Sequence, residues 1–106
     1  MYNIVISEPA EQDIRNAVEY IDEELQNRAA AENFLDDIDK AVLSLTDMPL
    51  RYPLVADEIL AGWGIRSFPV NNYLVFYVVR TKTKTGVIER VLYKKRDWEA
   101  ILKNDI

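Results

Sequence analysis

Residues 73–79 read Tyr-Leu-Val-Phe-Tyr-Val-Val, and after a short turn residues 86–93 read Gly-Val-Ile-Glu-Arg-Val-Leu-Tyr. Both stretches are rich in β-branched and aromatic residues, which favour strands. The first stretch is apolar on both faces, which is typical of a central strand. A further strand is predicted at about 64–69, joined to the first through Asn71 and Asn72 because asparagine tolerates the positive φ of a tight turn. These patterns predict three antiparallel strands in sequence.

Two helices are predicted ahead of these strands. Ser7 is a suitable N-cap, and Pro9 suits the first turn, where a missing N–H costs nothing. Apolar residues then recur at helical spacing, and we expect the first helix to end near residues 25–26. Asn27 caps the second helix, which Pro49 ends because proline disfavours helix in the residue before it. The short link between the two predicts an antiparallel helical hairpin.

The remaining segments complete an α+β fold in the order β-α-α-β-β-β. A short strand is expected at 2–6 and a short terminal helix at 97–103. Residues 49–64 form a connection with a fixed bend at 51–53 and a turn of helix at 55–60. The helical hairpin is expected to pack on one face of a small antiparallel sheet, which buries the apolar stripes of both layers. Residues 1–106 are read as a single domain.

Composition excludes several classes of chemistry. Of the 106 residues 49% are apolar and 29% charged, with a formal net charge of −5 and no cysteine or histidine. Disulfides, thiolate metal sites, histidine-ligated zinc and Ser-His-Asp catalysis are therefore excluded. We expect no cofactor, no metal and no small-molecule substrate. No apolar run is long enough to span a bilayer and the N-terminus lacks signal-peptide features, so a cytoplasmic protein without a membrane partner is expected.

The charge is divided unevenly along the chain. Residues 1–50 hold 12 acidic and 3 basic residues, a net charge of −9, whereas residues 51–106 hold 6 acidic and 10 basic residues, a net charge of +4. Overall acidity argues against general nucleic-acid binding, which depends on neutralising phosphates. However, residues 80–96 hold seven bases and one acid and end in the triplet at 94–96. Such a triplet is usually a solvated turn, but here it can also bind an anion or a regulator that covers it.

Four segments, taken together and in order, resemble the RelE/ParE superfamily of bacterial type II toxins. They are Ser7-Glu8-Pro9-Ala10-Glu11 with Asp13-Ile14, then Arg51-Tyr52-Pro53, then Gly64-Ile65-Arg66-Ser67-Phe68-Pro69-Val70-Asn71-Asn72-Tyr73-Leu74-Val75-Phe76-Tyr77, and finally Arg90-Val91-Leu92-Tyr93-Lys94-Lys95-Arg96-Asp97-Trp98. The resemblance spans nearly the whole chain. It implies a growth-inhibiting toxin that is silenced by a cognate antitoxin, whose extended or helical tail wraps it.

The resemblance implies one of two activities. RelE-like members cut mRNA on the ribosome, using arginines and lysines to stabilise phosphate charge and a tyrosine, histidine or glutamate to handle protons. ParE-like members inhibit DNA gyrase and lack that set. In this chain Leu74 stands where RelE-like enzymes commonly carry arginine, and Tyr93 stands where many relatives have histidine. These departures, the long hairpin and the acidic net charge favour the ParE-like branch.

Nuclease chemistry, if present, is expected to use Arg66, Arg90, Tyr93, Lys95 and Arg96 without a metal. Attack by a ribose 2′-hydroxyl needs a base, an acid and a cation near the developing charge. Arg66 and Arg90 supply that clamp if their side chains share a face of the sheet. Tyrosine ordinarily has a pKa near 10 and is a poor base at neutral pH, so neighbouring cations are required. The alternative reading of these residues is structural: solvent-facing cations and a tyrosine at the edge of the sheet.

Three hypotheses follow for the whole chain. The first and favoured one is a ParE-like toxin that inhibits DNA gyrase by protein contact. The second is a RelE-like, ribosome-dependent mRNA endonuclease, and the third is an inactive relative that acts only as a binding module. In each case the expected partner is an antitoxin that adds a helix or a strand. Trp63 is expected near the antitoxin groove and Trp98 as the anchor of the last helix, whereas Tyr73, Phe76 and Tyr77 are expected in the packing of the core and sheet.

Overall fold

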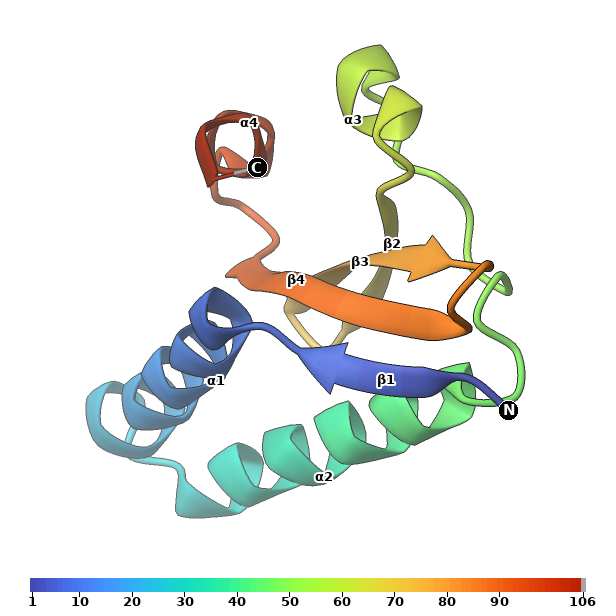
Figure 1. Cartoon of the computed structure of the whole chain (residues 1–106). Helices are drawn as coiled ribbons and strands as arrows, with labels where there is room; N and C mark the ends of the chain where they lie inside the picture. The colour runs from blue at the N-terminus through green and yellow to red at the C-terminus, as the bar shows by residue number, and fades with distance from the viewer. Residues whose placement is uncertain (106) are drawn as a thin grey trace.

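The computed structural model describes residues 1–105 and contains one four-stranded sheet (Figure 1). Strands β1 (Asn3–Ile6), β2 (Arg66–Val70), β3 (Tyr73–Arg80) and β4 (Thr85–Tyr93) lie in the order β1-β4-β3-β2. The β2–β3 and β3–β4 pairs are antiparallel, as predicted. Asn71 has a φ of 55° in the turn between β2 and β3, as expected for an asparagine in a tight turn. The predicted α+β class is confirmed.

Strand β1 departs from the prediction of a wholly antiparallel sheet, because it runs parallel to β4. The helical hairpin returns the chain to the end of the sheet where β1 begins, and the Tyr2 N–H donates to the Thr46 carbonyl at 2.8 Å there. Strand β2 therefore starts at the same end as β1, and β4, two strands later, runs in the same direction. Gly86 allows this close pairing, since a Cβ at that position would lie 2.7 Å from Cδ1 of Ile4.

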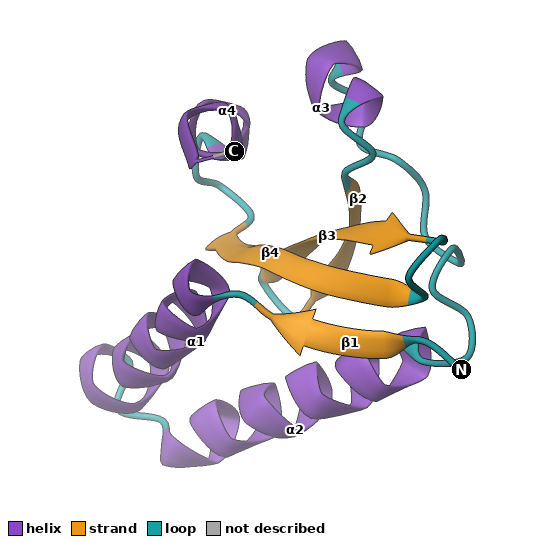
Figure 2. Ribbon diagram, in the orientation of Figure 1, coloured by secondary structure: helices purple, strands orange, loops and turns teal. Residues whose placement is uncertain are grey.

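The helical hairpin covers one face of the sheet (Figure 2). It consists of α1 (Glu8–Glu19), a π-helical turn η1 (Tyr20–Glu24) and α2 (Arg28–Leu45). Both predicted caps are present: the Ala10 N–H donates to Oγ of Ser7 at 3.2 Å, and the Ala30 N–H donates to Oδ1 of Asn27 at 3.0 Å. Helix α2 ends at Leu45, before Pro49, which was predicted to end it. The backbone already tightens at Thr46, whose N–H donates to the Leu43 carbonyl at 3.1 Å.

The main core lies between this hairpin and the sheet. Its buried members are Ala10, Ala17, Phe34, Ile38, Leu45, Phe68, Val70, Val75, Tyr77, Ile88 and Val91. Tyr52 stacks on Phe68 with ring centroids 4.3 Å apart, and the Tyr77 hydroxyl donates to the Pro49 carbonyl at 2.7 Å. These two contacts fix the bend predicted at residues 51–53. The predicted packing role of Tyr77 is confirmed.

Two short helices, α3 (Glu58–Gly62) and α4 (Trp98–Asp105), stand on the opposite face of the sheet (Figure 1). The ring centroid of Trp98 lies 5.2 Å from that of Phe76, which confirms Trp98 as the anchor of the last helix. The Lys103 ammonium donates to Oδ2 of Asp57 at 2.9 Å and ties α4 to α3. The Leu60 backbone N–H and this ammonium hold the pKa of Asp57 below its ordinary 3.8, so the pair is charged at neutral pH.

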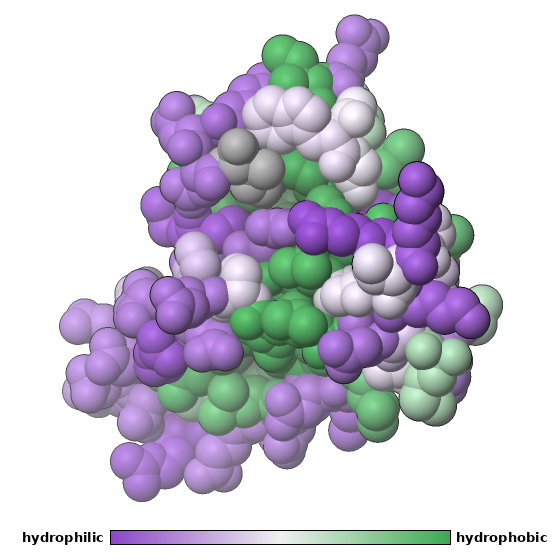
Figure 3. All heavy atoms as spheres, in the orientation of Figure 1, coloured by the Kyte–Doolittle hydropathy of each residue, from purple (hydrophilic) through white to green (hydrophobic). Residues whose placement is uncertain are grey.

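The surface seen in Figure 3 carries a group of hydrophobic atoms at its centre, over β1 and β4, and smaller hydrophobic groups at its edges among hydrophilic atoms. Within residues 1–105, no helix has the length and apolar character needed to cross a bilayer.

Candidate functional site

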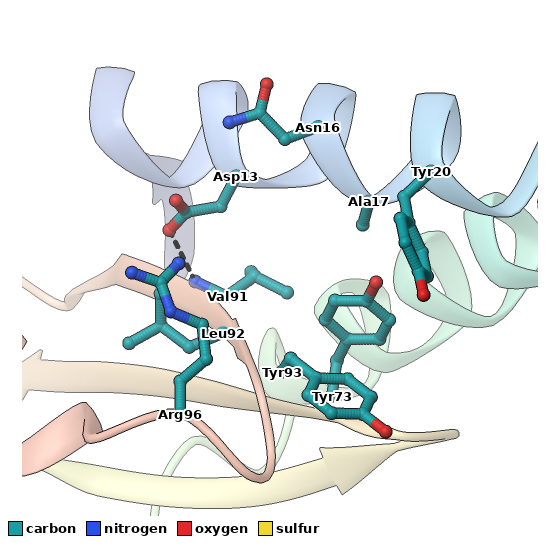
Figure 4. A pocket seen from close by; sticks show the side chains of 9 residues that line it. All are labelled: Asp13, Asn16, Ala17, Tyr20, Tyr73, Val91, Leu92, Tyr93 and Arg96. Carbon is teal, nitrogen blue, oxygen red and sulfur yellow. Dashed lines mark hydrogen bonds between the residues drawn. The ribbon is translucent and has the colours of Figure 1, made fainter. Parts of the chain in front are cut away.

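A groove of about 360 Å³ opens between α1 and the C-terminal half of β4 (Figure 4). Its walls come from three places: α1 with the first residue of η1, the start of β3, and β4 with the turn that follows it. The lining residues are Asp13, Asn16, Ala17, Tyr20, Tyr73, Val91, Leu92, Tyr93 and Arg96. Most of this surface is apolar or aromatic, with a carboxylate and a guanidinium at one end.

The groove exists because β1 covers only the first half of β4. The last β1 residue, Ile6, lies opposite Ile88. Ser7 then ends the pairing: its N–H donates to the Ile88 carbonyl at 3.0 Å, and its hydroxyl donates to the Glu89 carbonyl at 2.9 Å. The chain turns into α1 at that point, while β4 continues through an irregularity in its pairing with β3. The edge of β4 from Val91 onward therefore faces α1 instead of a strand.

Asp13 closes one end of the groove through a partly buried ion pair. Its Oδ2 accepts from Nε of Arg90 at 2.7 Å, and its Oδ1 accepts from a terminal guanidinium nitrogen of Arg90 at 2.9 Å. The same carboxylate accepts the Val91 N–H at 3.0 Å, which replaces the missing strand partner (Figure 4). The side chains of Arg90 and Asp13 are only 14% and 9% exposed. Such bidentate, charge-assisted geometry holds both groups in place.

Arg90 also pairs with Asp105 in α4, so one guanidinium joins α1, β4 and the terminal helix. The hydrogen bonds that Arg90 donates to Asp13 raise the pKa of Arg90 above its ordinary value, although burial opposes that shift. The guanidinium is thereby held between two carboxylates. A phosphate would have to displace them to bind there.

Three tyrosines form the aromatic part of the groove. The rings of Tyr73 and Tyr93 meet edge to face with centroids 5.7 Å apart, and Tyr73 packs on Phe34 at 4.9 Å. Tyr20 faces them from η1 (Figure 4). Burial raises the pKa of Tyr73, and the nearby Tyr20 and Tyr93 phenols raise it further. The Tyr73 hydroxyl therefore stays protonated at neutral pH and acts as a hydrogen-bonding group rather than a base.

The predicted nuclease residues are only partly gathered by the fold. Tyr93 and Arg96 both line the groove, and Lys95 is exposed on the same turn. Arg90 lies at the closed end and is held by Asp13 and Asp105. Arg66 lies elsewhere, because it sits in the edge strand β2 and donates to the Tyr52 carbonyl at 2.7 Å.

The predicted clamp of Arg66 and Arg90 is wrong, because the two side chains do not share a face. Arg66 lies directly opposite Tyr77, and Arg90 lies directly opposite Phe76. Neighbouring residues of a strand point to opposite faces of the sheet. Tyr77 belongs to the core under the helical hairpin, whereas Phe76 belongs to the cluster under α4. The two arginines are thus separated by the sheet itself.

The basic segment of residues 80–96 is also divided by the fold. Arg80, Lys82 and Lys84 lie at the β3–β4 turn, whereas the triplet at 94–96 follows the other end of β4. The nine residues of β4 separate the two groups by about 26 Å at the usual rise of a strand. The local basic face expected from sequence is therefore two surfaces rather than one.

Seven of the nine groove residues were missed as site residues from sequence, four of them on the helical hairpin. Asp13, Asn16, Ala17 and Tyr20 stand at spacings of three, four and seven residues, which places them on one face of α1. The signal in the sequence was this second stripe, which contains polar and aromatic residues and lies beside the apolar stripe of the same helix. Tyr73 was assigned to packing and does pack, but it also lines the groove. Trp63 caps the end of α3 and does not line this groove, and its expected place beside the antitoxin stays a prediction.

Similarity to known proteins agrees with this architecture. A sequence profile described as ParE toxin of type II toxin-antitoxin system, parDE, matches residues 4–98. The chain belongs to this toxin family. The resemblance to the RelE/ParE superfamily is thereby confirmed, and the protein is the toxin of a type II toxin–antitoxin system. No curated protein matches it in sequence.

Two solved structures share the fold of the toxin. A chain of the chromosomal ParDE system from P. aeruginosa superposes with a TM-score of 0.70 at 17% identity, covering 88% of this chain and 96% of that chain. A chain of the RelBE2 toxin–antitoxin complex from Mycobacterium tuberculosis superposes with a TM-score of 0.57 at 24% identity, covering 87% of this chain and 96% of that chain. Both relatives come from toxin–antitoxin systems, which supports an antitoxin as the partner of this toxin.

Proposed function

We propose that the toxin stops growth by binding DNA gyrase through protein contact, without cutting RNA. The observation that carries this proposal is the position of the two arginines. Arg90 is held between two carboxylates, and Arg66 lies on the other face of the sheet. RNA cleavage needs a base, an acid and a cation around one reacting phosphate. The residues expected for cleavage do not form such an arrangement, because Arg66 and Arg90 lie on opposite faces of the sheet.

The position of Leu74 supports the same proposal. RelE-like enzymes commonly carry arginine just after the tyrosine that opens the central strand, and this chain has Leu74 there. Leu74 packs against the cluster beneath α4, which includes Phe76, Leu92 and Leu102. An apolar side chain in such a cluster cannot bind phosphate. The face of the sheet under α4 therefore serves packing in this toxin.

We further propose that the antitoxin occupies the groove between α1 and β4. Its tyrosines match the aromatic anchors that dominate protein interfaces. The N–H groups of Val91 and Tyr93 point away from β3, because the Lys94 N–H donates to the Asn72 carbonyl and N–H directions alternate along a strand. Asp13 accepts the Val91 N–H, while the Tyr93 N–H faces the open edge. An extended antitoxin segment can pair there, and an apolar side chain can enter between the tyrosines.

The target is tested with purified toxin and gyrase in a supercoiling assay. We expect inhibition by the wild type, and equal inhibition by a Tyr93→Phe, Arg66→Ala double variant, because neither residue takes part in chemistry. Full supercoiling at a large excess of folded toxin would remove gyrase as the target. In parallel, mRNA cleavage is measured on translating ribosomes. Cleavage that the double variant lowers roughly 100-fold would establish the nuclease instead, since loss of acid–base catalysis costs at least that much.

The groove is tested by replacing Tyr20, a half-exposed wall residue, with alanine. Truncating an aromatic anchor typically costs more than about 1 kcal/mol of binding, so we expect the antitoxin to bind at least about fivefold more weakly. The affinity is measured by titration calorimetry. The antitoxin is purified together with the toxin, separated from it, and then titrated into the wild type or the variant. Leu43→Ala is the matched control, because Leu43 is 69% exposed on α2 and does not line the groove. Equal affinities for wild type and Tyr20→Ala would place the antitoxin elsewhere.

A further inference from the structure

The β3–β4 turn carries a basic surface that lies outside the groove. Residues 80–84 read Arg-Thr-Lys-Thr-Lys, and all five are exposed. No ion pair within residues 1–105 includes Arg80, Lys82 or Lys84. The turn is closed by the Lys84 N–H, which donates to the Thr81 carbonyl at 3.4 Å. We call these five residues the basic tip.

The basic tip lies at the end of the sheet away from the groove. It is beside the start of β1, where the Asn3 N–H donates to the Lys84 carbonyl at 3.0 Å. In Figure 3 hydrophilic side chains project over this end of β3 and β4. An antitoxin seated in the groove leaves the basic tip uncovered.

The composition of the basic tip indicates the kind of partner it fits. Protein interfaces are anchored by aromatic and large apolar side chains, and the basic tip has none. Phosphate groups of nucleic acids are bound by lysine and arginine and by serine and threonine hydroxyls, which are the residue types present. We propose that the basic tip contacts the phosphate backbone of duplex DNA.

The contact is expected to be weak, independent of sequence and directional. The basic tip holds arginine, lysine and threonine, which are the residue types that bind phosphates, and no asparagine or glutamine, so we expect contacts to the backbone to dominate. Residues 1–50, which hold β1 and the helical hairpin, carry a net charge of −9 and repel DNA. DNA is therefore expected to approach from the end of the sheet that bears the basic tip rather than from the side of the hairpin. This inference holds whether or not gyrase is the target, because it concerns the toxin alone.

The test is fluorescence anisotropy of a 25-base-pair duplex of random sequence, titrated with the full-length toxin. We expect a Kd of about 10⁻⁴ M at 50 mM salt, and a plot of log K against log salt with a slope of about −2.7 for three neutralised phosphates. The triple variant Arg80→Gln, Lys82→Gln, Lys84→Gln is expected to bind at least tenfold more weakly and to lose most of this slope. All three residues are exposed, so the thermal unfolding curve is expected to stay unchanged.

The matched control removes three positive charges at the other end of β4. Lys94→Gln, Lys95→Gln, Arg96→Gln changes the net charge equally, and we expect it to lower DNA affinity by less than threefold. Equal losses in both triple variants would overturn the proposal, since they would show an effect of net charge alone. No anisotropy change with wild type at 20 mM salt would overturn it as well. A poly-glutamate peptide of 25 residues that binds as tightly, with the same slope, would replace DNA by an acidic protein as the partner.

Discussion

Arg90→Ala is expected to lower the free energy of unfolding by about 3 kcal/mol, the lower end of the range for breaking a buried ion pair. Without the guanidinium, Asp13 stays mostly buried and keeps only the Val91 N–H as a partner. Because the Val91 N–H still donates to Asp13, the loss of stability is expected at the lower end of that range. Urea unfolding followed by circular dichroism measures it. The melting temperature is expected to fall by roughly 12 °C or more, given 4–8 °C per kcal/mol in domains of about this size.

The chain offers a control with the same substitution. Arg15 is 62% exposed and lies 3.9 Å from Glu11 across one turn of α1. Such surface pairs contribute at most about 0.5 kcal/mol, so Arg15→Ala is expected to unfold almost as the wild type does. Similar losses in both variants would mean that the pair of Arg90 with Asp13 is no stronger than a surface pair. A double-mutant cycle with Asp13→Ala then isolates the coupling between the two residues.

The ion pair also positions the proposed antitoxin site. Asp13 lines the groove while its carboxylate holds both Arg90 and the Val91 N–H at the edge of β4. Arg90 in turn reaches Asp105, so the closed end of the groove is joined to α4. A change in this pair is therefore expected to move the floor of the groove.

Phe34→Ala is expected to cost about 4 kcal/mol of unfolding free energy, within the range for deleting a buried aromatic ring. Phe34 is fully buried between α2 and the sheet. Its ring packs on Tyr73 at a centroid distance of 4.9 Å, beneath the groove. Alanine leaves a cavity that the helical hairpin cannot close without moving relative to β3. Chemical denaturation gives the loss directly.

Leu35, the next residue along α2, provides the comparison. It is 38% exposed and points away from the core, so Leu35→Ala is expected to cost less than about 1 kcal/mol. Comparing Phe34→Ala with Leu35→Ala separates the loss of core packing from the change in helix propensity. Replacement by alanine leaves helix propensity unchanged or slightly improves it. If Phe34→Ala cost no more than Leu35→Ala, the core between hairpin and sheet would be looser than its burial indicates. Weakened antitoxin binding by folded Phe34→Ala is expected as well, because Tyr73 loses its support.

Local patterns predicted most of the elements. Ser7 and Asn27 cap helices where expected, because a capping side chain bonds to a backbone N–H only a few residues away. The three later strands are joined by short turns, which leave antiparallel pairing as the only option. Trp98 and Phe76 were likewise assigned correctly, since large aromatic residues in apolar stretches are usually buried.

Contacts between distant residues were beyond the reach of those patterns. The parallel pairing of β1 with β4 joins residues more than 80 positions apart, and its direction depends on where α2 returns the chain. Asp13 and Arg90 are 77 residues apart, and no local pattern near either residue predicts that they pair. The same holds for the groove, whose tyrosines come from three elements. Periodicity in a sequence shows which face of an element is buried, because that depends on neighbours three or four residues away. Which side chains then meet across the core depends on how whole elements pack, and that arrangement separated Arg66 from Arg90 and paired Arg90 with Asp13.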